Sequence, residues 1–279
     1  MRAPDWLAIA VSRLGIPALL PRRGPLIVTY HGIGGEDGVT VEALERQLVA
    51  ITRRRRVVPL VEAVESVGRR ESGDVAAITF DDGYRDCVEL ALPVLRAKRL
   101  HATLFVPAGW LGKRNAWDAS RPQREILTAR ELRGLDPDSI TIGAHGLTHT
   151  RLSQMPPRQL QAETSVARKV LEDACGRAVT LCAYPHGQRD DFDLSAERAV
   201  EDAGFIAACS TRFGRGSGLA ERFCLRRIGL EPGDSLTRVE RKLDGAYDWI
   251  ASKETLGAFS REALRRGGVE VGISGHRQR

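Results

Sequence analysis

Residues 76–84 of the chain read AAITFDDGY, a short apolar run that ends in two adjacent carboxylates and a glycine. The run Ala76–Phe80 predicts a buried β-strand, and Gly83 lets the chain turn away from its end. Two neighbouring carboxylates repel each other unless one caps a following helix or a bound cation offsets their charges. For an isolated Asp81-Asp82 pair, helix capping explains the residues at least as well as a cation does, so other signals must decide.

The alternation of a short apolar run with a longer helical stretch extends to both sides, from Leu26 onward. Helical spacing of apolar residues marks stretches such as Val41–Ile51 and Gln159–Ala174, as well as the tail beyond Ser235. Strands that alternate with helices predict an α/β fold with a parallel sheet, and eight strands suit a (β/α) barrel. The predicted strands are Leu26–Tyr30, Val57–Leu60, Ala76–Phe80, Ala102–Val106, Ile140–Ala144, Thr180–Tyr184, Phe205–Cys209 and Cys224–Leu230.

A second polar cluster follows the predicted strand Ile140–Ala144. Residues 145–149 read HGLTH, which places His145 and His149 four residues apart at a strand end. A lone histidine is more often a hydrogen-bonded structural residue, but a pair with this spacing suits a metal ion. Together with Asp82 the pair would form a set of two histidines and one carboxylate.

Two weaker signals lie at two further strand ends. The turn Tyr184-Pro185-His186-Gly187 could point backbone N–H groups at a ligand, although such a turn is usually only a turn. Tyr30-His31-Gly32 places a titratable side chain directly after the first strand. In parallel barrels the loops after the carboxyl ends of the strands form the active face, so the common position of all four clusters predicts one site.

The composition limits the classes of partner. The net charge is +6, but the densest basic block, Arg53–Arg56, has no interleaved aromatic side chains to stack on bases, so we expect no nucleic-acid partner. The five cysteines include no CxxC pair and predict neither a zinc knuckle nor a disulfide framework. The apolar run Trp6–Leu20 is interrupted by Arg13 and Pro17 and is too short to span a membrane. We expect a cytoplasmic location, with peripheral membrane contact as an alternative, and nothing in the sequence indicates an oligomeric state.

These motifs together resemble the polysaccharide deacetylase family, also called the NodB-homology or carbohydrate esterase family 4 group. The resemblance runs from about Leu26 to Ser235. Residues 76–106, AAITFDDGYRDCVELALPVLRAKRLHATLFV, resemble the first signature region, and IGAHGLTHTRL from Ile142 resembles the second. The resemblance implies a distorted (β/α) barrel, often of seven strands, so one of the eight predicted strands is expected to lie outside it.

The resemblance also implies roles for individual residues. Asp81 matches the catalytic base of the family, and Asp82, His145 and His149 match the ligands of its divalent metal ion. The ion implied is Zn²⁺, with other first-row transition metals as alternatives. The turn 184–187 resembles a motif in which the backbone N–H after the proline, here that of His186, helps to hold the oxyanion.

The chain departs from the family pattern at two places. Many members have an arginine two residues before the proline of that turn, where this chain has Ala183. A late histidine that usually serves as general acid is absent near Ile228–Leu230. The branch of the family that acts on exopolysaccharides has a Tyr-His pair near the N-terminus in its place. This pattern points to His31 as the general acid, with the side chain of His186 as the competing candidate.

We therefore expect a metal-dependent hydrolase that removes N-acetyl or similar N-acyl groups from the amino sugars of a polysaccharide or oligosaccharide, in exopolysaccharide or cell-envelope metabolism. The expected organisation is an N-terminal segment at 1–24, a catalytic domain at 25–235 and a helical C-terminal tail at 236–279. Trp110, Trp117 and Asp118 fall in a loop after the fourth strand, where aromatic rings stack on sugars or pack the loop; packing is favoured slightly.

Other functions compatible with the same residues stay open. The nearest is a deacylase or deformylase of a lipid-linked amino sugar at the cytoplasmic face of the membrane, and related folds also open cyclic ureides. Two histidines and a carboxylate bind Fe(II) in mononuclear oxygenases as well, although the adjacent Asp81 argues against that class. A carbohydrate-binding protein without turnover is the remaining alternative.

Overall fold

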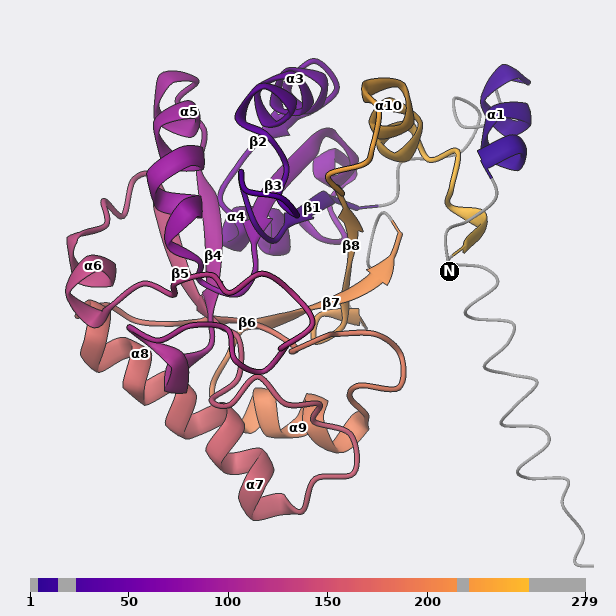
Figure 1. Cartoon of the computed structure of the whole chain (residues 1–279). Coiled ribbons are helices and arrows are strands. Elements are labelled where there is room, and N and C mark those ends of the chain that lie inside the picture. Colours follow the sequence, from indigo (N-terminus) through magenta and orange to yellow (C-terminus); the bar gives the residue numbers. More distant parts are fainter. Residues whose placement is uncertain (1–4, 15–23, 215–220, 251–279) are drawn as a thin grey trace, which may run out of the picture.

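The computed structural model describes residues 5–14, 24–214 and 221–250 (Figure 1). Its centre is a ring of seven parallel strands in the order β1-β8-β7-β6-β5-β4-β3, closed by pairing of β1 with β3. The predicted α/β barrel is thus confirmed. The strands are β1 (Leu26–Tyr30), β3 (Val75–Phe80), β4 (Ala102–Val106), β5 (Ile140–Ala144), β6 (Leu181–Ala183), β7 (Ala207–Phe213) and β8 (Leu225–Gly229).

The eighth predicted strand lies outside the closed ring. Strand β2 (Arg56–Val57) pairs only with the first two residues of β3, Val75 and Ala76. The prediction of a strand over Val57–Leu60 is therefore wrong beyond Val57. Pro59 stands at the N-cap of a helix that begins at Leu60, and proline at this position lacks the N–H that a longer strand would need.

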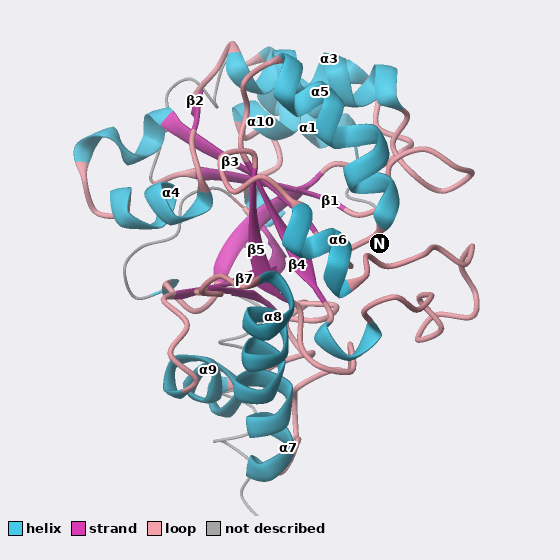
Figure 2. Ribbon diagram, turned by 90° about the vertical axis from the view of Figure 1, so that its left-hand side faces the viewer, coloured by secondary structure: helices cyan, strands magenta, loops and turns pink. Residues whose placement is uncertain are grey.

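Helices surround the ring of strands (Figure 2). The predicted helix Val41–Ile51 is observed, and the predicted helix Gln159–Ala174 is present as the consecutive segments α7, η4 and α8. The helical segments are α1 (Asp5–Arg13), α3 (Val41–Thr52), α4 (Leu60–Ser66), η1 (Arg70–Asp74), η2 (Cys87–Ala91), α5 (Leu92–Ala97), η3 (Ala108–Trp110), α6 (Ala129–Gly134), α7 (Pro157–Gln161), η4 (Ala162–Val166), α8 (Ala167–Cys175), α9 (Leu194–Asp202) and α10 (Leu236–Asp244). Within the described ranges, no helix is long and apolar enough to cross a membrane.

The two ends of the described chain pack against each other. Helix α10 confirms the helical pattern predicted beyond Ser235, and it lies beside α1 (Figure 1). Ala8 of α1 is buried in a small cluster with Ala246 and Tyr247. Residues 15–20 of the predicted apolar run Trp6–Leu20, and all of the tail beyond residue 250, lie outside the described residues.

Alternate residues of each strand face two different apolar clusters, as the two-residue period of a strand requires. In β3, Ala76, Ile78 and Phe80 belong to the larger cluster that packs with the helices, whereas Ala77 belongs to a smaller one with Phe105. Where β4 and β5 pair, Gly143 lies opposite Phe105 in the register. A Cβ atom at Gly143 would come within 2.4 Å of the Phe105 ring, so this glycine makes room for the aromatic side chain.

Replacement of Gly143 by alanine is therefore expected to destabilise the fold. The added methyl group must displace Phe105, and such overpacking costs about 1–3 kcal/mol. Gly134→Ala is a matched control, because a Cβ at that exposed helical position meets no atom within 4 Å and should raise stability by about 0.4–1 kcal/mol. Urea unfolding of the two variants measures both effects. Equal stability of Gly143→Ala and the unaltered chain would contradict the packing argument.

Candidate active site

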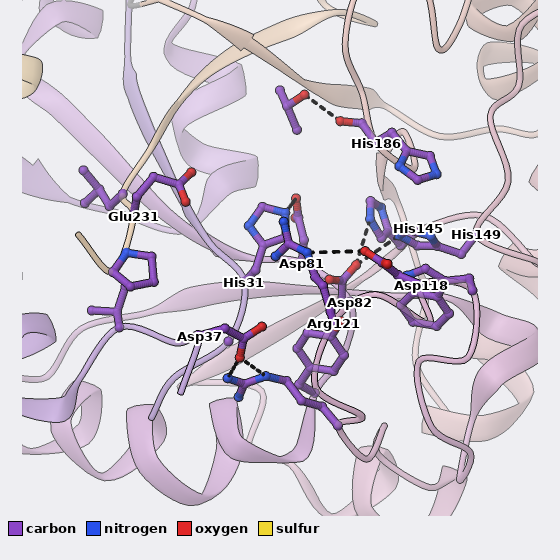
Figure 3. A pocket seen from close by; sticks show the side chains of 18 residues that line it. His31, Asp37, Asp81, Asp82, Asp118, Arg121, His145, His149, His186 and Glu231 are labelled. Atoms are coloured by element: carbon purple, nitrogen blue, oxygen red, sulfur yellow. Dashed lines mark hydrogen bonds and ion pairs between the residues drawn. The ribbon is translucent and has the colours of Figure 1, made fainter. Parts of the chain in front are cut away.

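The four polar clusters that follow β1, β3, β5 and β6 line one cavity of about 180 Å³ (Figure 3). The sequence predicted that these clusters share one face of the barrel, and the structure brings them together there. The predicted site residues that line the cavity are His31, Asp81, Asp82, His145, His149 and His186.

Asp82, His145 and His149 present one potential ligand atom each, and these atoms all lie within 4.8 Å of one another. The Nε2 atoms of His149 and His145 lie 3.1 Å and 3.5 Å from Oδ1 of Asp82, and all three side chains are buried. Asp82 and His149 have positive φ angles, 71° and 61°. This conformation costs on the order of 1–3 kcal/mol in a residue other than glycine, so contacts elsewhere in the structure must offset the strain at both residues.

Hydrogen bonds orient the two imidazoles. Nδ1 of His145 lies 2.8 Å from the carbonyl oxygen of Ala183, which can only accept, so Nδ1 carries a proton and Nε2 is the ring nitrogen that faces Asp82. Burial alone would raise the pKa of Asp82, but hydrogen bonds with His145 and His149 hold this pKa well below its usual range. Two imidazole nitrogens and an ionised carboxylate are the donors that zinc and related divalent ions use, so these residues fit such an ion.

Asp81, the adjacent carboxylate, is paired with Arg227 of β8 inside the ring of strands. The two guanidinium nitrogens Nη1 and Nη2 each donate to a different carboxylate oxygen of Asp81 at 2.7 Å, and both residues are fully buried. Burial alone would raise the pKa of Asp81, but the charge of Arg227 and its hydrogen bonds keep this pKa below its usual value. Arg227 also donates to the Ser210 carbonyl at 2.8 Å, and to the Thr29 and Thr79 hydroxyls.

Sequence reasoning missed Arg227. It noted that Ala183 stands where many relatives have an arginine, and the structure shows a guanidinium that reaches Asp81 from another strand. The signal was present in the consecutive pair Arg226-Arg227 within the predicted strand Cys224–Leu230. Because successive side chains of a strand point to opposite faces, one of the two arginines had to point into the barrel.

His31 and His186 lie on opposite sides of the two aspartates (Figure 3). Nε2 of the half-exposed His31 lies 3.8 Å from Oδ2 of Asp81. The ring of His186 lies 5.0 Å from that of His149, and burial together with this neighbour lowers the pKa of His186. His186 also has a positive φ of 59°, and its carbonyl accepts a hydrogen bond from the Thr211 hydroxyl at 2.6 Å.

Arg124 holds the loop that carries His31. Its guanidinium contacts Asp37 and Asp86 and donates to the Gly34 carbonyl at 2.9 Å. Asp86 in turn accepts a hydrogen bond from the backbone N–H of Ile33. This charged cluster ties the segment after β1 to the segment after β3, so the two sides of the cavity are fixed relative to each other.

The loop after β4 forms another wall of the cavity. Trp117 stacks on His149 with ring centroids 4.2 Å apart and meets the edge of Trp110 at 5.1 Å. Trp110 donates from its indole to the Thr148 carbonyl and packs the loop, whereas Trp117 also lines the cavity, so the choice between packing and sugar stacking stays a prediction at Trp117. Asp118 lines the cavity on this side. Sequence reasoning did not predict the other charged residues of the rim, which are Asp37, Arg121, Arg124 and Glu231.

The Asp81–Arg227 pair predicts a specific stability pattern. Arg227→Met should lower the free energy of unfolding by about 3–5 kcal/mol, because it leaves the Asp81 carboxylate buried without its partner. Asp81→Asn should also destabilise the protein, but the double variant should be less destabilised than the sum of the two single changes. Urea unfolding in the presence of a chelator measures this cycle. Additive changes would show that the two side chains do not stabilise each other.

Solved structures of known proteins share this fold. The chain is similar to solved structures of the deacetylase PplD of Streptococcus pyogenes in complex with acetate (TM-score 0.67, 19% identity, 80% of this chain and 99% of that chain) and of IcaB from Ammonifex degensii (TM-score 0.69, 19% identity, 80% and 97%). At this identity the likeness shows the fold alone.

Sequence comparison goes further than the fold. The chain is 28% identical over 167 residues to the Bacillus subtilis (strain 168) protein YxkH, whose name assigns it provisionally to the polysaccharide deacetylases. The match covers 60% of this chain and 55% of that relative, so the chain spans little more than half of YxkH. The model of the polysaccharide deacetylase family matches residues 68–207, half of the chain, and this stretch holds Asp81, Asp82, His145 and His149. The chain therefore belongs to the polysaccharide deacetylase family.

Proposed function

We propose that the protein is a metal-dependent hydrolase that removes N-acetyl groups from amino sugars of a polysaccharide or oligosaccharide in exopolysaccharide or cell-envelope metabolism. One observation carries the proposal: the buried set of Asp82, His145 and His149 lies beside a second ionised carboxylate, Asp81, at the rim of the barrel. Family membership supports the sugar substrate, and the resemblance of Tyr30-His31 to the Tyr-His pair of the exopolysaccharide branch supports the exopolysaccharide context.

Asp82, His145 and His149 would hold the ion. A bound divalent ion would supply Lewis acidity, because it lowers the pKa of a water molecule and polarises an amide carbonyl. We propose Zn²⁺ because neutral imidazoles and a carboxylate suit it. The orientation of His145 by the Ala183 carbonyl supports this assignment, since it fixes the ring nitrogen that faces Asp82.

Asp81 is the proposed general base. Arg227 occupies one lone pair on each carboxylate oxygen, and a carboxylate offers about four such sites, so Asp81 can still accept a proton from the attacking water. The arginine keeps the base ionised within a buried site. It also holds the carboxylate in one orientation, so the accepting oxygen needs no reorganisation during the reaction.

His31 is the proposed general acid. It lies on the Asp81 side of the cavity, and protonation of the leaving amine avoids its departure as an unstable anion. The backbone N–H of His186, on the opposite side, would stabilise the oxyanion. Loss of one such donor typically raises the activation free energy by about 3 kcal/mol. The position of the His186 ring against His149 argues against its side chain as the proton donor.

A lipid-linked amino sugar is the second candidate substrate, and one feature of helix α1 favours it. Trp6 and Leu14 are 69% and 71% exposed at the two ends of α1, whereas Ala8 between them is buried. Exposed tryptophan and leucine side chains on an amphipathic segment suit the interface of a membrane, where a lipid-linked substrate would be found. A cytoplasmic, membrane-peripheral location is part of this second proposal.

Acetate release from N-acetylated oligosaccharides tests the chemistry, with a lipid-linked N-acylated amino sugar as a parallel substrate. Asp82→Ala and treatment with a chelator should each abolish turnover, and zinc should restore only the chelated wild type. Asp81→Asn should lower kcat by about 10²–10⁴-fold, the usual contribution of a positioned base. Asp173→Asn, at an exposed helical position, is the control and should leave turnover unchanged. Unchanged turnover in both site variants would contradict the mechanism.

The identity of the proton donor has its own test. His31→Ala should lower kcat by about 10²–10⁴-fold while the chain retains its metal, because His31 lies outside the ligand set. His186→Ala keeps the backbone N–H and should reduce kcat less. Single-turnover kinetics and metal analysis measure the two effects separately. The opposite order of the two variants would assign the donor to His186, and loss of metal in His31→Ala would place His31 among the ligands.

A further inference from the structure

The loop between the two histidine ligands is held from outside the cavity by Glu163. The carboxylate oxygen Oε2 accepts hydrogen bonds from the backbone N–H groups of Leu147 and Thr148, at 2.7 Å and 3.0 Å. The other oxygen, Oε1, accepts from the Thr148 hydroxyl. Glu163 is only 5% exposed, and no salt bridge to it is found in the described part of the chain. Three hydrogen-bond donors of one loop therefore converge on a single buried carboxylate.

The carbonyl groups of the same loop are held from the other side. Ala108 donates its backbone N–H to the Gly146 carbonyl at 3.0 Å, and Gly109 donates to the Leu147 carbonyl at 2.8 Å. A Cβ atom at Gly146 would lie 2.9 Å from Glu163 and 3.0 Å from the Pro185 ring. The loop is thus clamped between η3, Glu163 and the turn after β6, and among the described residues Glu163 is the one side chain that binds its N–H groups.

A local irregularity of the helix places Glu163 there. Residues Ala162–Val166 form η4, a π-helical turn between α7 and α8. Two consecutive side chains of this turn, Glu163 and Thr164, are buried. The Thr164 hydroxyl donates a hydrogen bond to the Leu160 carbonyl of the same helical stretch, whereas the Glu163 carboxylate faces the loop. Such π-turns occur frequently at functional sites.

We propose that Glu163 is a positioning residue for the metal site, which fixes the Leu147-Thr148 turn and thereby the separation of His145 and His149. The proposal rests on the proposed metal binding by Asp82, His145 and His149. His149 has a positive φ, and its ring is bound to Asp82 at Nε2, whereas the buried Nδ1 atom has no hydrogen-bond partner that would fix the ring from the other side. Its position depends on the backbone of the preceding residues, and that backbone is bound by Glu163.

The dissociation constant for Zn²⁺, measured by competition with a chromophoric chelator, tests the proposal. Glu163→Ala should raise this constant about 10–100-fold, the usual effect of removing a group that orients a metal ligand. Glu163→Gln should restore most of the affinity, because its amide oxygen can accept the two N–H bonds and its NH₂ group can donate to the Thr148 hydroxyl. Thermal unfolding of the metal-free variants shows whether each one is folded.

Glu172→Ala is the matched control, since Glu172 lies on the adjoining helix α8 and binds Arg168 and the Val179 N–H, away from the loop. It should lower stability without a change in zinc affinity. The inference is overturned if Glu163→Ala binds zinc as tightly as the unaltered chain, or if Glu172→Ala weakens zinc binding to the same extent. An unaltered chain that binds zinc but releases no acetate would contradict the proposed function and leave the role of Glu163 intact.

Discussion

The buried ion pair between Asp81 and Arg227 is the constraint on which the site depends. Removing two charges from water costs several kcal/mol per ion, and a well-packed apolar pair at the same place would often be more stable. The ring of strands compensates in part, because Thr29, Thr79 and the Ser210 carbonyl satisfy further N–H groups of the guanidinium. A pair of this kind therefore contributes orientation and charge at the rim more than it contributes stability.

The rim is strained as well as charged. Asp82, His149 and His186 all have positive φ angles, at three different strand ends. A positive φ raises the conformational free energy of each of these residues, and glycine would adopt it without that cost. Glycine cannot replace them, however, because the site needs their side chains. Contacts from other segments of the chain hold the rim: Glu163 binds the turn before His149, and Arg124 binds the loop that carries His31.

The periodicity of the sequence was sufficient to predict the ring of strands and the four clusters at its rim. Strands buried on both faces form continuous apolar runs, and the polar residues that end them stand out. Strand alternation indicated that Arg226 or Arg227 points into the barrel, but no local pattern identified Asp81, 146 residues away, as the partner, and none indicated that Glu163 binds the loop after β5. The true extent of strand β2 and the π-helical turn η4 were not predicted for a related reason, because tertiary contacts decide them. The roles of the site residues themselves remain predictions.

The stacking of Trp117 on His149 has a consequence for the evolution of specificity. Loops at the carboxyl face of a barrel usually change freely, because the ring beneath them is stable by itself. Here one loop both shapes the wall of the cavity and presses on a proposed ligand. Asp118 and Arg121 on the same loop pair with each other rather than with a proposed ligand, so we expect a change there to alter the sugar that binds, whereas a change at Trp117 would alter selectivity and the proposed metal centre together.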